Sequence, residues 1–488
     1  MANHIQSHPD DEQLLRQLGY RQELARRMSG FSNFAISLSI ICILAGGITS
    51  FHVGLCSAGG ASIGLGWPLA CLFSLTVAWT MGQIASAFPT AGGLYHWGSI
   101  LGGRACGWVT AWFNLTGLIT VLAAINAGTY DFAMAAFNLT PPEASAAAIR
   151  TIVVVGMTLS QGMFNHYGIR LTTRLTDLSG YLILALTAVL TLALVLTTKH
   201  FEWSRLWTFA NFSGLPESGA VFPKQNNLAW LFALGLLLPA YTITGFDASA
   251  HTSEETIGAA RNVPRGIIRS VWVSGLFGWI LICAILLALP SVREGVDQGA
   301  NVVHWAIKAA LPGGLAWTLL AGIVAAQYLC GLAALTSGSR MMFAFARDGG
   351  LPFSNRLRAI NPRTGSPSVA VWVSASASAA FTILVPYTTI AAICTVLIYI
   401  SYVLPVAAGF FAVGRTWTRL GPWQLGAWYR PLAAVAVLGC LFLIVIGVQP
   451  PNQQAVWIIG SVVGLMLLVW FGLERKRFKG PPQINGGL

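Results

Sequence analysis

Twelve long apolar runs constrain this chain more than any other feature of its sequence. A helix needs about 20 apolar residues to cross the hydrocarbon core of a bilayer. The runs cover roughly residues 32–56, 64–87, 105–133, 149–167, 175–197, 228–250, 266–289, 315–345, 367–384, 387–413, 431–448 and 455–473. Charged residues form only 9% of the chain, against about 25% in soluble domains. The sequence therefore predicts an all-α polytopic membrane protein with twelve transmembrane helices.

The positive charges indicate the orientation of these helices, because Lys and Arg are enriched in cytosolic loops. With both termini cytosolic, all but six of the 28 Lys and Arg residues fall on the cytosolic side. We expect a multi-pass protein of the plasma (inner) membrane with cytosolic N- and C-termini. The net charge of +12 comes from these loop anchors, so we expect the lipid bilayer and no nucleic acid as a partner.

Four segments follow from the order of the runs. Residues 1–30 are polar and lack a cleavable signal sequence, so they form an expected cytosolic tail. Residues 31–414 hold the first ten runs, residues 415–473 the last two, and residues 474–488 a second short tail. We therefore expect a ten-helix core with two additional C-terminal helices.

Two runs are interrupted at matching positions. The first is broken at 44–51 (LAGGITSF) and the sixth at 242–249 (TITGFDAS). Each opens a group of five runs, and because five is odd the second group would enter the membrane with opposite topology. Paired interruptions in inverted halves point to a solute site near the membrane midplane. The pattern predicts a five-plus-five inverted repeat around such a site.

The broken helices supply the first candidate binding residues. Free N–H groups and the positive end of a half-helix can bind a carboxylate, and free carbonyls can bind an ammonium. Two alternatives stay open: the glycines could be a helix-packing motif, and Asp247 could cap the next half-helix rather than bind substrate or carry a proton. The candidates are Gly46, Gly47, Thr49, Tyr130, Gly245, Phe246 and Asp247.

Other polar residues in the runs also have two interpretations. Thr336 and Ser337 lie in the eighth run, where their hydroxyls either join helices or hold a coupling cation. Histidines near the ends of the runs either relay protons or make ordinary hydrogen bonds. They are His52, His166 and His251.

Enzyme chemistry has little support in this sequence. The chain contains no GxxxxGK[ST], no HExxH and no GxSxG in context. The eight cysteines show no metal-ligand spacing. We therefore expect no enzyme, no cofactor and no metal site, and any uphill transport must be driven by a gradient of H⁺ or Na⁺.

Three motifs resemble those of the amino acid–polyamine–organocation permeases, in particular the amino acid and choline branch that includes GABA permeases. They are residues 86–95 (SAFPTAGGLY), residues 245–256 (GFDASAHTSEET) followed by 261–265 (RNVPR), and residues 339–352 (SRMMFAFARDGGLP). The resemblance covers about residues 20–475. It implies a LeuT-like fold with alternating access, and it extends the candidate site to Ile48 for a substrate carboxylate and Thr244 for its amino group.

Two positions depart from the pattern of that superfamily. Gln83 stands where a glutamate is usual in the second span, and Ile183 stands where some proton-coupled relatives carry a lysine. The usual lysine mechanism therefore does not transfer.

The sequence predicts a secondary transporter of amino acids or related amines such as GABA. A choline or polyamine transporter of the same fold, and a non-concentrative channel or nutrient sensor, remain as alternatives.

Overall fold

A computed structural model describes residues 9–385 and 387–482 as a bundle of helices. Ten helices in this part of the chain are long and apolar enough to cross a membrane. Two shorter apolar helices, Leu228–Thr242 and Ser368–Leu384, occupy the places of the expected sixth and ninth spans. The all-α polytopic fold class is therefore confirmed. The outer parts of both expected tails, residues 1–8 and 483–488, lie outside the described residues.

The first and sixth spans are divided into short helices, and most other spans are continuous. The first comprises α2 (Gly30–Ile41), α3 (Gly46–Thr49) and α4 (Phe51–Ala58), and the sixth comprises α10 (Leu228–Gly235), α11 (Leu237–Thr242) and α12 (Ala248–His251). The other spans are α6 (Gly66–Ala87), α7 (Leu94–Ala136), α8 (Ala146–His166), α9 (Ile169–Thr197), α13 (Ala259–Ala288), α16 (Gly313–Arg347), α18 (Ser368–Leu384), α19 (Tyr387–Ala412), α20 (Tyr429–Gly447) and α21 (Gln453–Val469).

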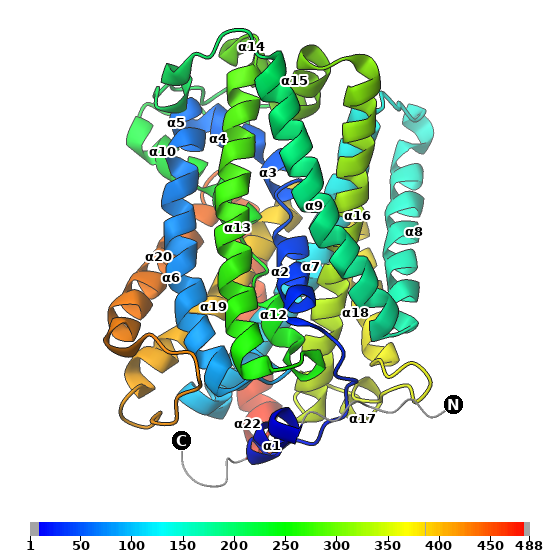
Figure 1. The fold of residues 1–488 in the computed structure, drawn as a ribbon, viewed down its shortest axis with the longest axis vertical. Helices are drawn as coiled ribbons and strands as arrows, with labels where there is room; N and C mark the ends of the chain where they lie inside the picture. The colour runs from blue at the N-terminus through cyan, green and yellow to red at the C-terminus, as the bar shows by residue number, and fades with distance from the viewer. Residues whose placement is uncertain (1–8, 386, 483–488) are drawn as a thin grey trace.

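Short helices cover the two ends of the bundle. α1 (Pro9–Gln17), α17 (Ser354–Leu357) and α22 (Arg475–Arg477) lie at one end, and α14 (Val292–Asp297) and α15 (Val302–Ala310) lie at the other (Figure 1). The last two belong to the long loop between the seventh and eighth spans. The two ends are therefore closed by different parts of the chain.

The divided first span lies at the centre of the bundle. The apolar stretch of this span is 94% buried inside the protein. The apolar stretch of the final span is only 6% buried and so faces lipid. α2 packs against α13, α9 and α12, and α3 packs against α11. The two divided spans therefore touch each other inside the protein, where a broken helix is tolerated.

One connecting segment is largely helical. Residues 88–104 separate the second and third apolar runs of the sequence, but α7 already begins at Leu94 and has a sharp kink at Gly103, where φ is +84°. Close packing explains the kink, because a Cβ on Gly107 would lie 1.6 Å from the Ser99 hydroxyl oxygen. The segment thus folds back on the long helix rather than spanning an open loop.

Candidate functional site

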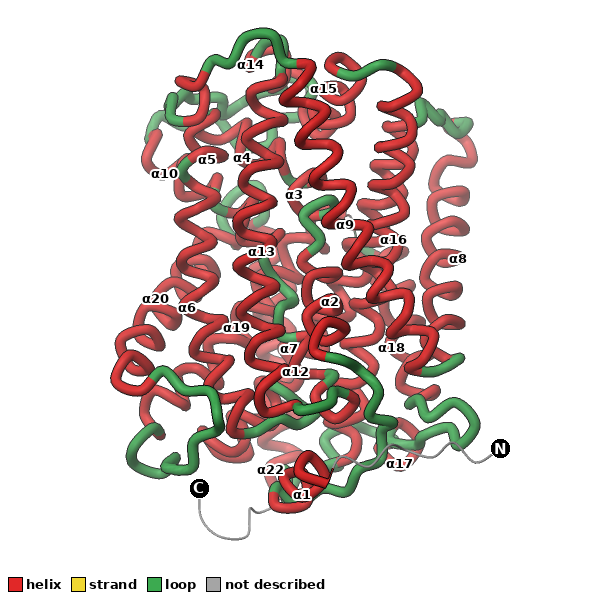
Figure 2. The backbone as a smooth tube through the Cα atoms, in the orientation of Figure 1, coloured by secondary structure: helices red, strands yellow, loops and turns green. Residues whose placement is uncertain are grey.

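Both divided spans lose their helical backbone in the middle of the bundle. α2 ends at Ile41, Cys42 has a φ of +21°, and helix resumes at Gly46. α11 ends at Thr242, Gly245 has a φ of +87°, and α12 begins at Ala248. Figure 2 shows the loop between α2 and α3 at mid-height in the bundle. The interruptions lie close to the stretches that the sequence singled out, 44–51 and 242–249.

Glycines allow the two interruptions to touch. A Cβ on Gly46 would lie 2.8 Å from the Thr242 Cα, and one on Gly245 would lie 2.2 Å from the Ile40 Cγ2. Contacts this short force the backbone or a packed side chain to move. Gly47 differs, because its Cβ would meet only ordinary contacts, the nearest being Trp67 at 3.6 Å. Of the two adjacent glycines, only Gly46 sets the separation of the broken helices.

A small cavity of about 20 Å³ lies against these interruptions. α7 and α16 complete its wall, so it is enclosed by four different spans. Among the described residues, those that line it include no Asp, Glu, Lys, Arg or His. The lining consists of Ile40, Ile41, Ala45, Gly46, Thr49, Val121, Ala124, Ile125, Gly128, Thr129, Tyr241, Thr242, Thr244, Gln327 and Cys330. A solute bound here meets hydroxyls, one amide and backbone groups, with no full charge.

Gln327 is a cavity residue that the sequence analysis missed. Its Nε2 donates to the Leu44 carbonyl at 3.0 Å, which ties α16 to the first interruption. Its Oε1 is buried and has no hydrogen-bond partner. An unpaired buried carbonyl costs free energy until a ligand donates to it. Gln327 is therefore a ready acceptor for a substrate N–H group, and its only sequence signal is an amide inside an apolar run.

We expect Gln327→Leu to raise the KM for uptake about tenfold or more, because the variant loses a hydrogen bond to a charged donor. Uptake of a radiolabelled amino acid over a range of concentrations measures this change. Cys330→Ala serves as the control, because it alters the same helix and cavity and leaves the free acceptor in place. An unchanged KM in Gln327→Leu would remove this residue from the site.

A larger cavity, of about 370 Å³, lies toward the end that carries α14 and α15. It shares Thr49 and Tyr241 with the central cavity, and its wall also includes Ser50 and His52. The two cavities are therefore neighbours that share part of one wall.

Asp247 lies away from the central cavity. Its side chain is fully buried and accepts hydrogen bonds from Tyr402 at 2.7 Å, Asn114 at 3.0 Å and His251 at 3.1 Å. It stands at the start of α12, yet it makes no capping bond to that helix. The capping alternative is therefore wrong, and Asp247 instead joins α7, α19 and α12.

The other expected site residues divide between the cavity and its surroundings. Gly46, Thr49 and Thr244 line the cavity. Phe246 is fully buried and lies against Tyr402, with ring centroids 4.8 Å apart. The remainder are outside the lining: Gly47, Ile48, Tyr130, Gly245, Asp247, Thr336 and Ser337. In the expected cation site, Thr336 donates to Asn165 at 2.8 Å and Ser337 has a buried hydroxyl without a partner.

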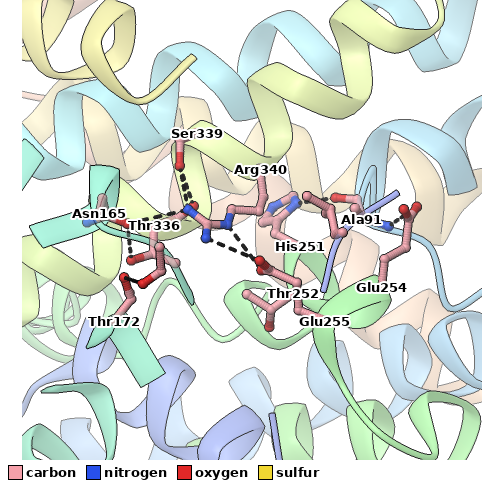
Figure 3. A network of polar contacts seen from close by, with 12 residues as sticks. Ala91, Asn165, Thr172, His251, Thr252, Glu254, Glu255, Thr336, Ser339 and Arg340 are labelled. Atoms are coloured by element: carbon pink, nitrogen blue, oxygen red, sulfur yellow. Dashed lines mark hydrogen bonds and ion pairs between the residues drawn. The ribbon is translucent and has the colours of Figure 1, made fainter. Parts of the chain in front are cut away.

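Two buried ion pairs close the end that carries α1. Arg340 donates to both oxygens of Glu255 at 3.1 and 3.2 Å, and both side chains are 0% exposed. Arg347 donates to both oxygens of Glu254 at 2.9 Å. Figure 3 shows the Arg340–Glu255 pair, with Asn165 and Ser339 beside the guanidinium. These two ion pairs, called the inner seal below, join α16 to the segment after α12.

The N-terminal segment covers the inner seal from outside. The Tyr20 hydroxyl donates to Asp348 at 2.7 Å, and the Arg347 guanidinium lies 3.9 Å from the centre of the Tyr20 ring. The backbone N–H groups of Arg27 and Met28 both donate to the Glu255 carbonyl at 2.8 Å. Burial, followed by the Asp348 carboxylate, raises the pKa of Tyr20, so its hydroxyl remains a donor. The N-terminal segment thus contacts both ion pairs of the inner seal, through Arg347 and through Glu255.

Comparisons with known proteins agree with this architecture. The family model described as "Amino acid permease" matches residues 28–471. The chain is 33% identical to the amino-acid permease BAT1 of Arabidopsis thaliana over 96% of this chain and 95% of that protein. It is 27% identical to the GABA-specific permease of Saccharomyces cerevisiae over 98% of this chain and 86% of that protein. The chain therefore belongs to the amino acid permease family, whose members are transporters rather than enzymes.

Proposed function

We propose that this amino acid permease carries small zwitterionic amino acids, GABA among them, by alternating access. The central cavity between the two interruptions is the observation that carries this proposal. It lacks a charged side chain, so it suits a solute whose own charges cancel. The substrate carboxylate would meet the backbone at Gly46, which is the one of the three expected carboxylate-binding residues that lines the cavity. The amino group would meet Thr244 and the free oxygen of Gln327.

The closed inner seal identifies one state of the proposed cycle. The larger cavity adjoins the central one on the side of α14 and α15, while two buried ion pairs lie at the opposite end. We place the sealed end on the cytosolic side of the plasma membrane, because all but six of the 28 Lys and Arg residues then face the cytosol. A gradient of H⁺ or Na⁺ would drive accumulation.

Competition among solutes tests the substrate class. In liposomes containing the purified permease, we expect neutral amino acids and GABA to inhibit uptake of a labelled neutral amino acid. Choline and putrescine should inhibit at least about tenfold less well, because no lining carboxylate compensates their charge. Preferred transport of choline or a polyamine would contradict the zwitterion proposal. No flux of any amino acid in the panel would contradict transport through this cavity.

A further inference from the structure

We propose that Asp247 and His251 together form a proton-binding site, and that proton release from this pair is coupled to opening of the inner seal. The proposal rests on the proposed function, since it assigns the ion that drives this permease. It uses groups that lie outside the substrate cavity. Both side chains are 0% exposed, and neither has an assigned role in binding the amino acid.

The acceptors around His251 are the observation from which we infer that both ring nitrogens carry a proton. One ring nitrogen, Nε2, lies 3.1 Å from Asp247 Oδ2, and the other, Nδ1, lies 3.3 Å from the Ala91 carbonyl oxygen. A carboxylate and a carbonyl only accept hydrogen bonds, so both contacts are satisfied when each ring nitrogen faces its partner through a proton. The Asp247–His251 pair thus holds one dissociable proton and is neutral overall.

Loss of that proton disfavours this conformation. A neutral imidazole that keeps its proton on Nε2 turns the Nδ1 lone pair toward the Ala91 carbonyl, and the Asp247 charge is left without compensation in a fully buried place. Both changes are unfavourable, because a buried unpaired charge costs several kcal/mol. The sealed structure is therefore the proton-loaded state. Release transfers the Nδ1 proton to water once this end opens.

The same network reaches the broken helix beside the cavity. The Tyr402 hydroxyl donates to Asp247 Oδ1 at 2.7 Å and accepts from the Gly245 N–H at 2.9 Å. Gly245 follows the cavity residue Thr244, and the Tyr402 ring packs on Phe246. A change of charge on Asp247 therefore acts directly on the backbone that bounds the substrate cavity.

On its other side the network reaches the inner seal. The Ala91 peptide accepts at its carbonyl from His251, and its N–H donates to Glu254 Oε1 at 3.1 Å. Glu254 is the carboxylate that Arg347 holds in the seal. Figure 3 shows His251 and Glu254 on either side of Ala91. Separation of Glu254 from Arg347 would shift this peptide and weaken the contact that keeps the His251 proton in place.

The charged and titratable groups around the pair come from several elements. α19 contributes Tyr402, and α7 contributes the neutral Asn114. α16, which packs against α12, contributes Arg340, and Arg340 is paired with Glu255. Glu254 and Arg347 face His251 through the Ala91 peptide and are paired with each other. The charged groups around Asp247 and His251 are therefore paired with one another.

Simultaneous measurement of proton and substrate flux in liposomes tests the proposal. The lumen contains a pH-sensitive dye, and the substrate is the radiolabelled amino acid best transported in the panel above. We expect substrate entry to acidify the lumen, and one unit of inward pH gradient to drive up to about tenfold accumulation. Accumulation that follows a Na⁺ gradient, with no acidification, would overturn the proposal and leave amino acid transport intact.

Variants separate coupling from substrate binding. His251→Gln should lose accumulation driven by the pH gradient and should retain exchange of labelled for unlabelled amino acid, because exchange needs no net proton release. His166→Gln, which changes a histidine whose ring accepts a hydrogen bond from Trp372, should keep the pH response. Retained pH-driven accumulation in His251→Gln, or loss of exchange in that variant when it elutes as a folded protein, would overturn the assignment.

The wild-type protein supplies a test that needs no variant. The substrate concentration that gives half-maximal exchange should be independent of external pH. The comparison uses a pH range in which the rate of net uptake changes several-fold. Equal pH dependence of exchange and net uptake would place the titrating group in the substrate cavity and contradict a separate proton site. Absence of exchange for every amino acid would contradict the proposed function, whereas exchange without proton movement would contradict only the coupling.

Discussion

Gly46→Ala is expected to lower the rate of amino acid uptake about ten- to hundredfold. The added Cβ would lie 2.8 Å from the Thr242 Cα and 3.0 Å from its hydroxyl oxygen, so the two interruptions must separate. Overpacking of this kind costs about 1–3 kcal/mol, and each 1.4 kcal/mol is a factor of ten. Because Gly46 also lines the cavity, the displacement changes the place where the substrate carboxylate would bind. Initial rates of uptake at matched protein density measure the effect.

Gly47→Ala provides the matched control. The substitution adds the same methyl group one residue away, where the nearest atoms are 3.6 Å distant and make ordinary contact. Uptake should stay within about twofold of wild type, since the added methyl group fits in this buried place without displacing its neighbours. Equal losses in the two variants would show that the glycines act only through helix packing.

Arg340→Met is expected to destabilise the protein by about 3–5 kcal/mol, the largest stability effect that the structure indicates. The substitution leaves the Glu255 carboxylate buried without a cation, since both side chains are 0% exposed. In the wild type the Arg340 guanidinium donates to both oxygens of this carboxylate, and a methionine side chain donates to neither. The apparent midpoint of thermal unfolding in detergent, measured at a fixed heating rate, reports the loss.

The double variant Arg340→Met with Glu255→Leu should recover most of that loss, because an apolar pair removes the unpaired charge. Arg293→Ala is the control for an exposed pair. Arg293 and Asp297 are 60% and 49% exposed, so its removal should cost at most about 1 kcal/mol. A double variant no more stable than Arg340→Met would mean that Glu255 is needed for contacts other than the ion pair.

The sequence predicted the positions of the spans because apolar run length is a local property. It also located the interruptions, since glycines and a buried acid are incompatible with a plain lipid-facing helix. Gly46 was identified for this reason. The distinction between Gly46 and Gly47 could not be predicted, because it depends on which of them faces Thr242 across the bundle.

The partners of the buried charges also could not be predicted from the sequence. Asp247 bonds to Tyr402, 155 positions away, and Glu255 pairs with Arg340, 85 positions away. No local pattern encodes such pairs in a single chain. The capping interpretation of Asp247 failed for the same reason. Its carboxylate accepts hydrogen bonds from three other side chains instead of from the N–H groups of its own helix.

The N-terminal cover also sets an order of assembly during synthesis. Tyr20 is made early, but its partners Arg347 and Asp348 follow the eighth span. Asp11 likewise bonds to the N–H groups of Gly258 and Ala259, which follow the sixth span. Asp11 can therefore pair once the sixth span has been made, whereas Tyr20 has no partner until the eighth span is complete. The transporter can close this end only late in its biogenesis.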